Sequence, residues 1–198
     1  MNAKGYISRA FEFTRQFLFK WTVNWRFVGE DTFLSTTFSQ ALAFANLGLL
    51  AIFMLTRWSG PSGLSIPDLL RRVYRPLPPR VEQQISLRVT PDFVMTTILS
   101  SLAIGMLCAR SLHYQFYAYI AWATPFLLWT SGLHPALIYM VCAAQEWAWN
   151  VYPSTDTSSK VVLGCLVVQV LGAWWGTRND FESGQGPFEK VGEHRHMD

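Results

Sequence analysis

Hydrophobic residues along this chain form long uninterrupted blocks instead of alternating with polar ones. The clearest block, Phe33–Leu55, contains no charged residue and is long enough to cross about 30 Å of hydrocarbon. Four further apolar blocks occupy 93–109, 114–129, 135–152 and 161–175. Blocks of this kind predict transmembrane helices. We therefore expect an all-α integral membrane protein with about five spans.

The segment Gly5–Val28 has a different pattern, in which apolar residues recur at three- and four-residue steps. The apolar series is Ile7, Ala10, Phe11, Phe17, Leu18, Trp21, Trp25 and Val28, and Arg9, Glu12, Gln16, Lys20 and Asn24 occupy the other face. A helix with Phe and Trp on one side and Lys and Arg on the other usually lies in the membrane interface. We expect residues 1–32 to form such an interfacial segment, either as a plain anchor or with a phosphate ligand.

Two polar regions complete the predicted organisation. The loop 56–92 holds six arginines, and the tail 176–198 is polar, with a composition typical of disorder. If the loop faces the cytosol, then that side carries nine basic residues, against two in the opposite loops and five in the N-terminal segment. Because cytosolic loops are enriched in Lys and Arg, we expect a cytosolic C-terminus, with the N-terminal segment on the other side.

The amino-acid composition supports a membrane protein and argues against several classes of function. Only 15% of the residues are charged, against roughly 25% in a soluble domain. A net charge of +3 without a basic block gives no reason to expect nucleic-acid binding. Cys108, Cys142 and Cys165 lie in apolar runs without ligand spacing, so we interpret them as buried hydrophobic residues. No phosphate loop, hydrolase motif or metal motif is present in the sequence, and we expect no metal and no cofactor.

Two polar clusters at the ends of apolar blocks are candidates for chemistry. Arg110 and His113 fall between the second and third blocks, where they could clamp a phosphate; alternatively, Arg110 only ends a helix. Glu146 and Asn150 are one helical turn apart near the end of the fourth block. A carboxylate inside a span normally faces the bundle and has a partner, so Glu146 is either functional or a structural pair.

Three stretches of this chain carry a family resemblance. The segments 17–27 (FLFKWTVNWRF), 110–116 (RSLHYQF) and 146–154 (EWAWNVYPS) resemble the endoplasmic reticulum (ER) dolichyl-phosphate-mannose-dependent α-1,3-mannosyltransferases of glycosyltransferase family 58. The resemblance runs from about Gly5 to Trp175 in consistent order. It implies a GT-C-type helical bundle in the ER membrane, of which this chain is the C-terminal part.

The resemblance also implies a reaction and a set of site residues. Mannose would move from dolichyl-phosphate mannose to Man5GlcNAc2-PP-dolichol on the luminal side, with inversion. By analogy with related enzymes, Arg110 and His113 would contact the donor phosphate, and Lys20, Asn24 and Arg26 would contact phosphate or sugar. Trp21 and Trp25 would form a stacking wall for sugar or lipid.

One departure from the family pattern concerns the catalytic base. Family members are about twice this length, and their acidic luminal loop has no counterpart here, so we expect this chain alone to be inactive. Direct displacement needs a carboxylate to accept the hydroxyl proton. Glu30 and Glu146 are weak candidates for that base, and Asp31 and Asp156 are the other acids on the expected luminal side. A non-catalytic membrane scaffold and a small transporter remain as alternatives.

Overall fold

The regular structure of this chain is helical throughout the part described. The computed structural model describes residues 5–7, 18–72, 74–75 and 77–179, and no strand occurs among them. The long helices are α3 (Thr36–Phe53), α6 (Pro91–Cys108), α7 (Tyr117–Thr130), α8 (Pro135–Asn150) and α9 (Asp156–Gly176). The short elements are η1 (Phe19–Trp21), η2 (Arg26–Val28), α2 (Glu30–Leu34), η3 (Met54–Trp58), η4 (Gly60–Ser62), α4 (Ile66–Arg72), α5 (Pro79–Arg88), η5 (Tyr114–Phe116) and η6 (Thr177–Asn179). The prediction of an all-α protein is confirmed.

Polar caps determine where three of the long helices begin. Ser35 precedes α3, and its hydroxyl accepts the backbone N–H of Phe38 at 3.2 Å. Thr90 does the same for Phe93 ahead of α6, also at 3.2 Å. Thr155 forms a capping box at the start of α9. These hydroxyls satisfy backbone donors that have no partner inside the helix.

Three of the predicted spans are long and apolar enough to cross a membrane: Thr36–Ser62, Pro91–Cys108 and Asp156–Gly176. The first of these continues α3 through the π-helical turn η3. The two other blocks are also helical, but α7 has 14 residues and α8 has 16. The chain is therefore a multi-pass membrane protein in which two of the helices are shorter than an ordinary span.

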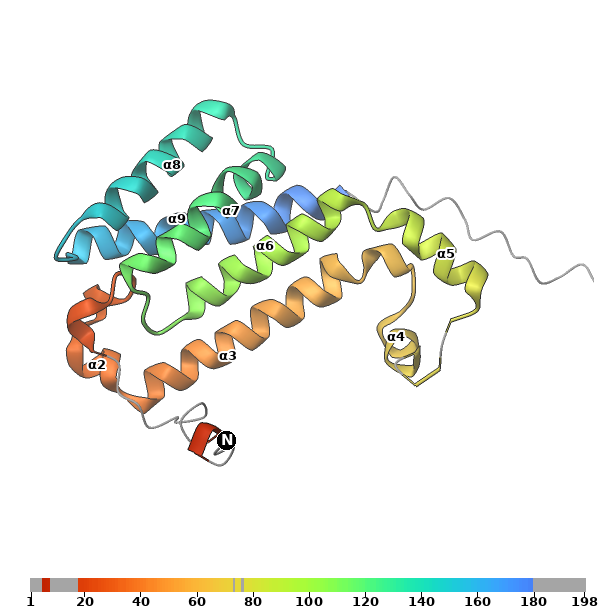
Figure 1. Ribbon diagram of the computed structural model, residues 1–198, viewed down its shortest axis with the longest axis horizontal. Coiled ribbons are helices and arrows are strands. Elements are labelled where there is room, and N and C mark those ends of the chain that lie inside the picture. Colours follow the sequence, from red (N-terminus) through yellow and green to blue (C-terminus); the bar gives the residue numbers. More distant parts are fainter. Residues whose placement is uncertain (1–4, 8–17, 73, 76, 180–198) are drawn as a thin grey trace, which may run out of the picture.

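Helix α9 lies at the centre of the bundle and α3 at its edge. Helix α9 packs against α6, α7 and α8, whereas α3 packs against α6 (Figure 1). In an 18-residue apolar stretch of each span, 44% of the α9 span is buried, against 11% of the α3 span. Within the centre, Gln145 Nε2 donates to Thr124 Oγ1 at 2.8 Å, and Gln169 Nε2 donates to Gln145 Oε1 at 2.7 Å. This buried amide network joins α7, α8 and α9, as polar groups commonly do between membrane helices.

The connections collect at two opposite ends of the bundle. The short elements η1, η2 and α2 lie beside the α6–α7 connection and the α8–α9 turn, while α4 and α5 lie at the far end (Figure 1). Consequently, the three stretches that carry the family resemblance meet at one end, and the arginine-rich loop is at the other.

The N-terminal segment departs from the single amphipathic helix expected over Gly5–Val28. Residues 5–7 are helical, 8–17 lie outside the described residues, and 18–28 contain only the turns η1 and η2. Between these turns Thr22, Val23 and Asn24 are completely buried. The helical prediction is wrong for this part because contacts with the bundle outweigh the local periodicity. The tail 180–198 also lies outside the described residues.

Candidate functional site

Asn24 attaches the N-terminal segment to the connection between α6 and α7. Its side-chain Nδ2 donates to the carbonyl of Ala109 at 2.6 Å, and its Oδ1 accepts the backbone N–H of Leu112 at 3.0 Å. The backbone N–H of Val23 also donates to the carbonyl of Leu112, at 2.9 Å. With no exposed surface and its amide engaged at both atoms, Asn24 holds the segment in place. This differs from the expected contact with phosphate or sugar.

A second set of hydrogen bonds attaches the same segment to the α8–α9 turn. Ser154 Oγ donates to the carbonyl of Thr22 at 2.7 Å. Ser159 Oγ donates to the carbonyl of Asn24 and accepts the backbone N–H of Arg26 at 3.0 Å. Sequence reasoning assigned no role to Ser159, although its place in a Ser- and Thr-rich turn marked it as polar. The three motif stretches therefore form one continuous hydrogen-bonded assembly.

Two guanidinium groups lie on either side of one aromatic pair at this end of the bundle. The rings of Phe19 and Phe33 meet edge to face, with centroids 5.3 Å apart. The Arg26 guanidinium is 5.3 Å from the Phe19 ring, and the Arg110 guanidinium is 5.9 Å from the Phe33 ring. Such cation–π contacts orient guanidinium groups without neutralising their charge. Two guanidinium groups are therefore held beside one aromatic pair at this end of the bundle.

Further hydrogen-bond donors occur in the two segments that carry these cations. The Nη1 of Arg26 and the hydroxyl of Ser111 are buried and make no hydrogen bond within the described part of the chain. The imidazole of His113 is half-buried, and no hydrogen bond to its ring is present among the described residues. Lys20 is exposed, with its ammonium 5.3 Å from the Trp21 ring. These segments therefore contain several donors that an anionic ligand could use.

The two tryptophans expected to form a wall have different surroundings. Trp21 is half-buried and stacks on Tyr152 at 6.3 Å, and Tyr152 meets Tyr114 edge to face at 5.6 Å. Tyr114 in turn donates its hydroxyl to the carbonyl of Val151 at 2.9 Å. Trp25 instead packs edge to face against Phe38 of α3, with centroids 5.5 Å apart. Trp21 thus belongs to an exposed aromatic cluster, and Trp25 packs against the bundle.

Glu146 has hydrogen-bond partners on two helices. It accepts from the hydroxyl of Tyr117 on α7 and from Asn150 Nδ2 at 3.1 Å. Glu146 and Asn150 thus share a helix face, as their spacing predicts. Both carboxylate oxygens are engaged, yet the residue is exposed. Beside it, between α7 and α8, lies an open cavity of about 350 Å³ that Tyr139, Cys142 and Gln145 also line. The other candidate base, Glu30, is exposed in the first turn of α2.

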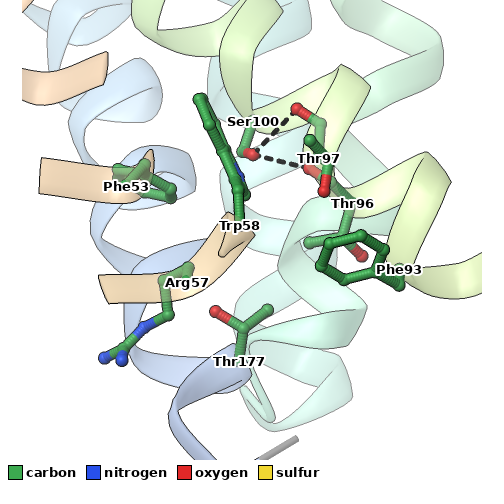
Figure 2. A pocket seen from close by; sticks show the side chains of 8 residues that line it. All are labelled: Phe53, Arg57, Trp58, Phe93, Thr96, Thr97, Ser100 and Thr177. Carbon is green, nitrogen blue, oxygen red and sulfur yellow. Dashed lines mark hydrogen bonds between the residues drawn. The ribbon is translucent and has the colours of Figure 1, made fainter. Parts of the chain in front are cut away.

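Another pocket lies at the opposite end of the bundle, between α3, α6 and the end of α9 (Figure 2). Its volume of about 10 Å³ is roughly what one water molecule requires. Figure 2 shows the Arg57 guanidinium turned away from the Thr97 and Ser100 side chains. It lies 4.5 Å from the Trp174 ring instead, and its Nε donates to the Trp174 carbonyl at 2.7 Å. No candidate residue from the sequence lines this pocket.

Comparison with known families gives a match over residues 1–159 to the family described as ALG3 protein. The chain belongs to this family. Curated relatives with the name Dol-P-Man:Man(5)GlcNAc(2)-PP-Dol alpha-1,3-mannosyltransferase include proteins from Neurospora crassa and Homo sapiens. The one from Neurospora crassa is 53% identical over 192 residues, which cover 95% of this chain and 43% of the relative. The one from Homo sapiens is 41% identical over 197 residues, which cover 98% of this chain and 41% of the relative.

The chain thus spans about two fifths of the length of these curated ALG3-family relatives. The family resemblance found in the sequence is confirmed. No solved structure matches the chain, so its assignment to a GT-C-type bundle stays a prediction.

Proposed function

We propose that this chain forms the donor-phosphate side of a dolichyl-phosphate-mannose-dependent α-1,3-mannosyltransferase of the ER membrane. The acceptor would be Man5GlcNAc2-PP-dolichol, as in the printed names of the relatives. The observation that supports this most directly is the pair of guanidinium groups, Arg26 and Arg110, around the Phe19–Phe33 pair. A lipid phosphate is the anionic group that a membrane mannosyl donor would bring to this end of the bundle.

The residues would act on the leaving group. Transfer breaks the bond between mannose C1 and the phosphate oxygen and forms a bond from C1 to the acceptor hydroxyl oxygen, whose proton passes to a carboxylate. Negative charge then accumulates on dolichyl phosphate. Arg110, Arg26 and His113 would stabilise that charge through charge-assisted hydrogen bonds, and Lys20 would add charge at the rim. We expect the carboxylate base outside this chain, with Glu30 and Glu146 as the candidates within it.

Complementation tests the activity. Cells that lack the endogenous transferase would receive either this chain or a fusion of it to the portion of the Neurospora crassa relative that the match leaves out. We expect only the fusion to restore elongation of the lipid-linked oligosaccharide beyond five mannoses. Rescue by the chain alone would contradict a base located elsewhere, and failure of both proteins to rescue, despite stable expression, would contradict the proposed activity.

His113 can be tested in the same fusion. Replacing His113 with Ala removes a donor to the phosphate, and we expect mannosyl transfer in isolated membranes to fall by about tenfold or more. The matched control is His134→Ala, because His134 is exposed at the other end of the bundle, where its Nδ1 accepts the backbone N–H of Ala136 at 3.3 Å. Equal activities of the two variants would exclude His113 from the donor site.

A further inference from the structure

Two faces of the bundle are exposed, and their chemistry differs. The outer face of α3 presents side chains such as Phe44, Leu47 and Ile52, which are 73%, 62% and 48% exposed, and α3 contains no charged residue. Such a surface is suited to contact with lipid. The face formed by α7 and α8 also exposes large side chains, including Trp122 and Tyr139, but it carries the Glu146 carboxylate and the cavity of about 350 Å³ as well.

The carboxylate of Glu146 is incompletely compensated. Its two partners, Tyr117 and Asn150, are neutral donors, and no Lys or Arg forms an ion pair with it within the described residues. Ionisable groups in membrane segments normally face protein or a water-filled cavity and have a partner there. A carboxylate at this position therefore argues against lipid as the occupant. It also argues against a lipid phosphate, which has the same sign of charge.

The lengths of α7 and α8 lead to the same conclusion. At about 1.5 Å per residue, 14 and 16 residues extend over roughly 21 and 24 Å, which is less than the hydrocarbon thickness of about 30 Å. Helices that are too short for the hydrocarbon are commonly covered by other protein, which satisfies the backbone groups at their ends. In contrast, the Thr36–Ser62 span, which includes α3, has 27 residues.

The ALG3-family relatives contain more polypeptide than this chain, since the match covers 43% of the Neurospora crassa relative and 41% of the human one. We propose that the α7–α8 face is the surface on which the remaining part of these longer proteins packs. The occupant is a membrane helix that presents a Lys, an Arg or another hydrogen-bond donor to Glu146. The proposal of an assembly surface does not depend on the proposed binding of the donor phosphate.

Site-specific photo-crosslinking tests the proposal. A benzophenone amino acid would replace Tyr139 on the α7–α8 face or Leu47 on α3, and each chain would be co-expressed with the tagged remaining portion of the Neurospora crassa relative. We expect irradiation to join the two polypeptides from position 139 and not from position 47. Joining from both positions equally, or adducts of only lipid or glycolipid mass at position 139, would overturn the proposal.

Variants of Glu146 identify which kind of group on the partner helix contacts this carboxylate. We expect Glu146→Leu to reduce the protein adduct at position 139 by about tenfold or more, since it removes the partner of a buried polar group. Glu82→Leu is the control, because Glu82 is exposed on α5 at the other end. Glu146→Gln keeps a carbonyl acceptor and removes the charge. An adduct of undiminished yield would then indicate a neutral donor on the partner helix, and a reduced yield would indicate a Lys or Arg. An undiminished adduct in Glu146→Leu would overturn the role of Glu146.

Discussion

Asn24 is completely buried, and its side chain contacts residues that lie 85 and 88 positions further along the sequence. Its amide forms hydrogen bonds with the carbonyl of Ala109 and the backbone N–H of Leu112, which both lie in the connection between α6 and α7. A buried backbone group without a partner is costly, so the amide stabilises both segments together. Through this link the RSLHYQF motif and the segment that carries Arg26 keep a constant relative position.

Replacement of Asn24 should therefore lower stability. We expect Asn24→Ala to reduce the free energy of unfolding by about 1–3 kcal/mol, because the Ala109 carbonyl and the Leu112 N–H lose their partner. Asn24→Asp should destabilise the fold at least as much as Asn24→Ala, because it places a buried carboxylate oxygen against the Ala109 carbonyl oxygen. The measurement is thermal unfolding of the purified chain in detergent.

The control for this series is Asn46→Ala in α3, where the amide oxygen is buried and makes no hydrogen bond within the described residues. This substitution removes no hydrogen bond from that oxygen, so we expect little change in the unfolding temperature. If Asn24→Ala unfolded at the same temperature as Asn46→Ala, the buried amide link would not contribute to stability.

Helix α9 approaches the end of α7 closely at Gly176. A Cβ atom on Gly176 would lie 2.0 Å from the Thr130 carbonyl oxygen and 2.7 Å from the Ser131 Cα, so only glycine fits there. A Cβ on Gly164 of the same helix would meet nothing within 4 Å. The end of α9 and the end of α7 are thus in contact through backbone atoms, which side-chain movement cannot relieve.

This difference predicts opposite effects for the same substitution. Gly176→Ala should destabilise the bundle by about 1–3 kcal/mol or more because the α7 and α9 backbones must separate. Gly164→Ala should be neutral or stabilise by up to about 1 kcal/mol, since alanine favours the helix. Thermal unfolding in detergent measures both, and equal midpoints would show that the two helices separate at little cost.

At the scale of the whole molecule, the three motif stretches gather at the end of the bundle opposite the arginine-rich loop (Figure 1). With that end luminal, the arginine-rich loop and α5 face the cytosol, in agreement with the distribution of basic residues.

Cysteine accessibility in sealed ER microsomes tests the orientation. Glu82→Cys on α5 and Asp156→Cys at the start of α9 replace exposed residues at opposite ends of the bundle. We expect a membrane-impermeant maleimide to label the first in intact vesicles and the second only after permeabilisation. The unsubstituted chain gives the background from Cys108, Cys142 and Cys165. The reverse labelling pattern would invert the proposed topology.

Local signals were sufficient for part of this architecture. The apolar blocks predicted the five long helices in order, and the four-residue spacing predicted that Glu146 and Asn150 share a face, as their hydrogen bond shows. Periodicity misled for residues 18–28, where burial of Thr22, Val23 and Asn24 replaced a surface helix. A repeating pattern describes only one element, and it contains no information about competing contacts from distant segments.

The sequence by itself determined the membrane class, the order of the helices and the family, because apolar run length, helical spacing and motif residues are local properties of the chain. The tertiary structure alone decided that Asn24 is a buried link, that Arg26 and Arg110 flank one aromatic pair, and that Glu146 borders an open cavity. Each of these depends on atoms from separate segments. Hydrogen bonds and packing are effective only over a few ångströms, so only the fold decides which residues come that close.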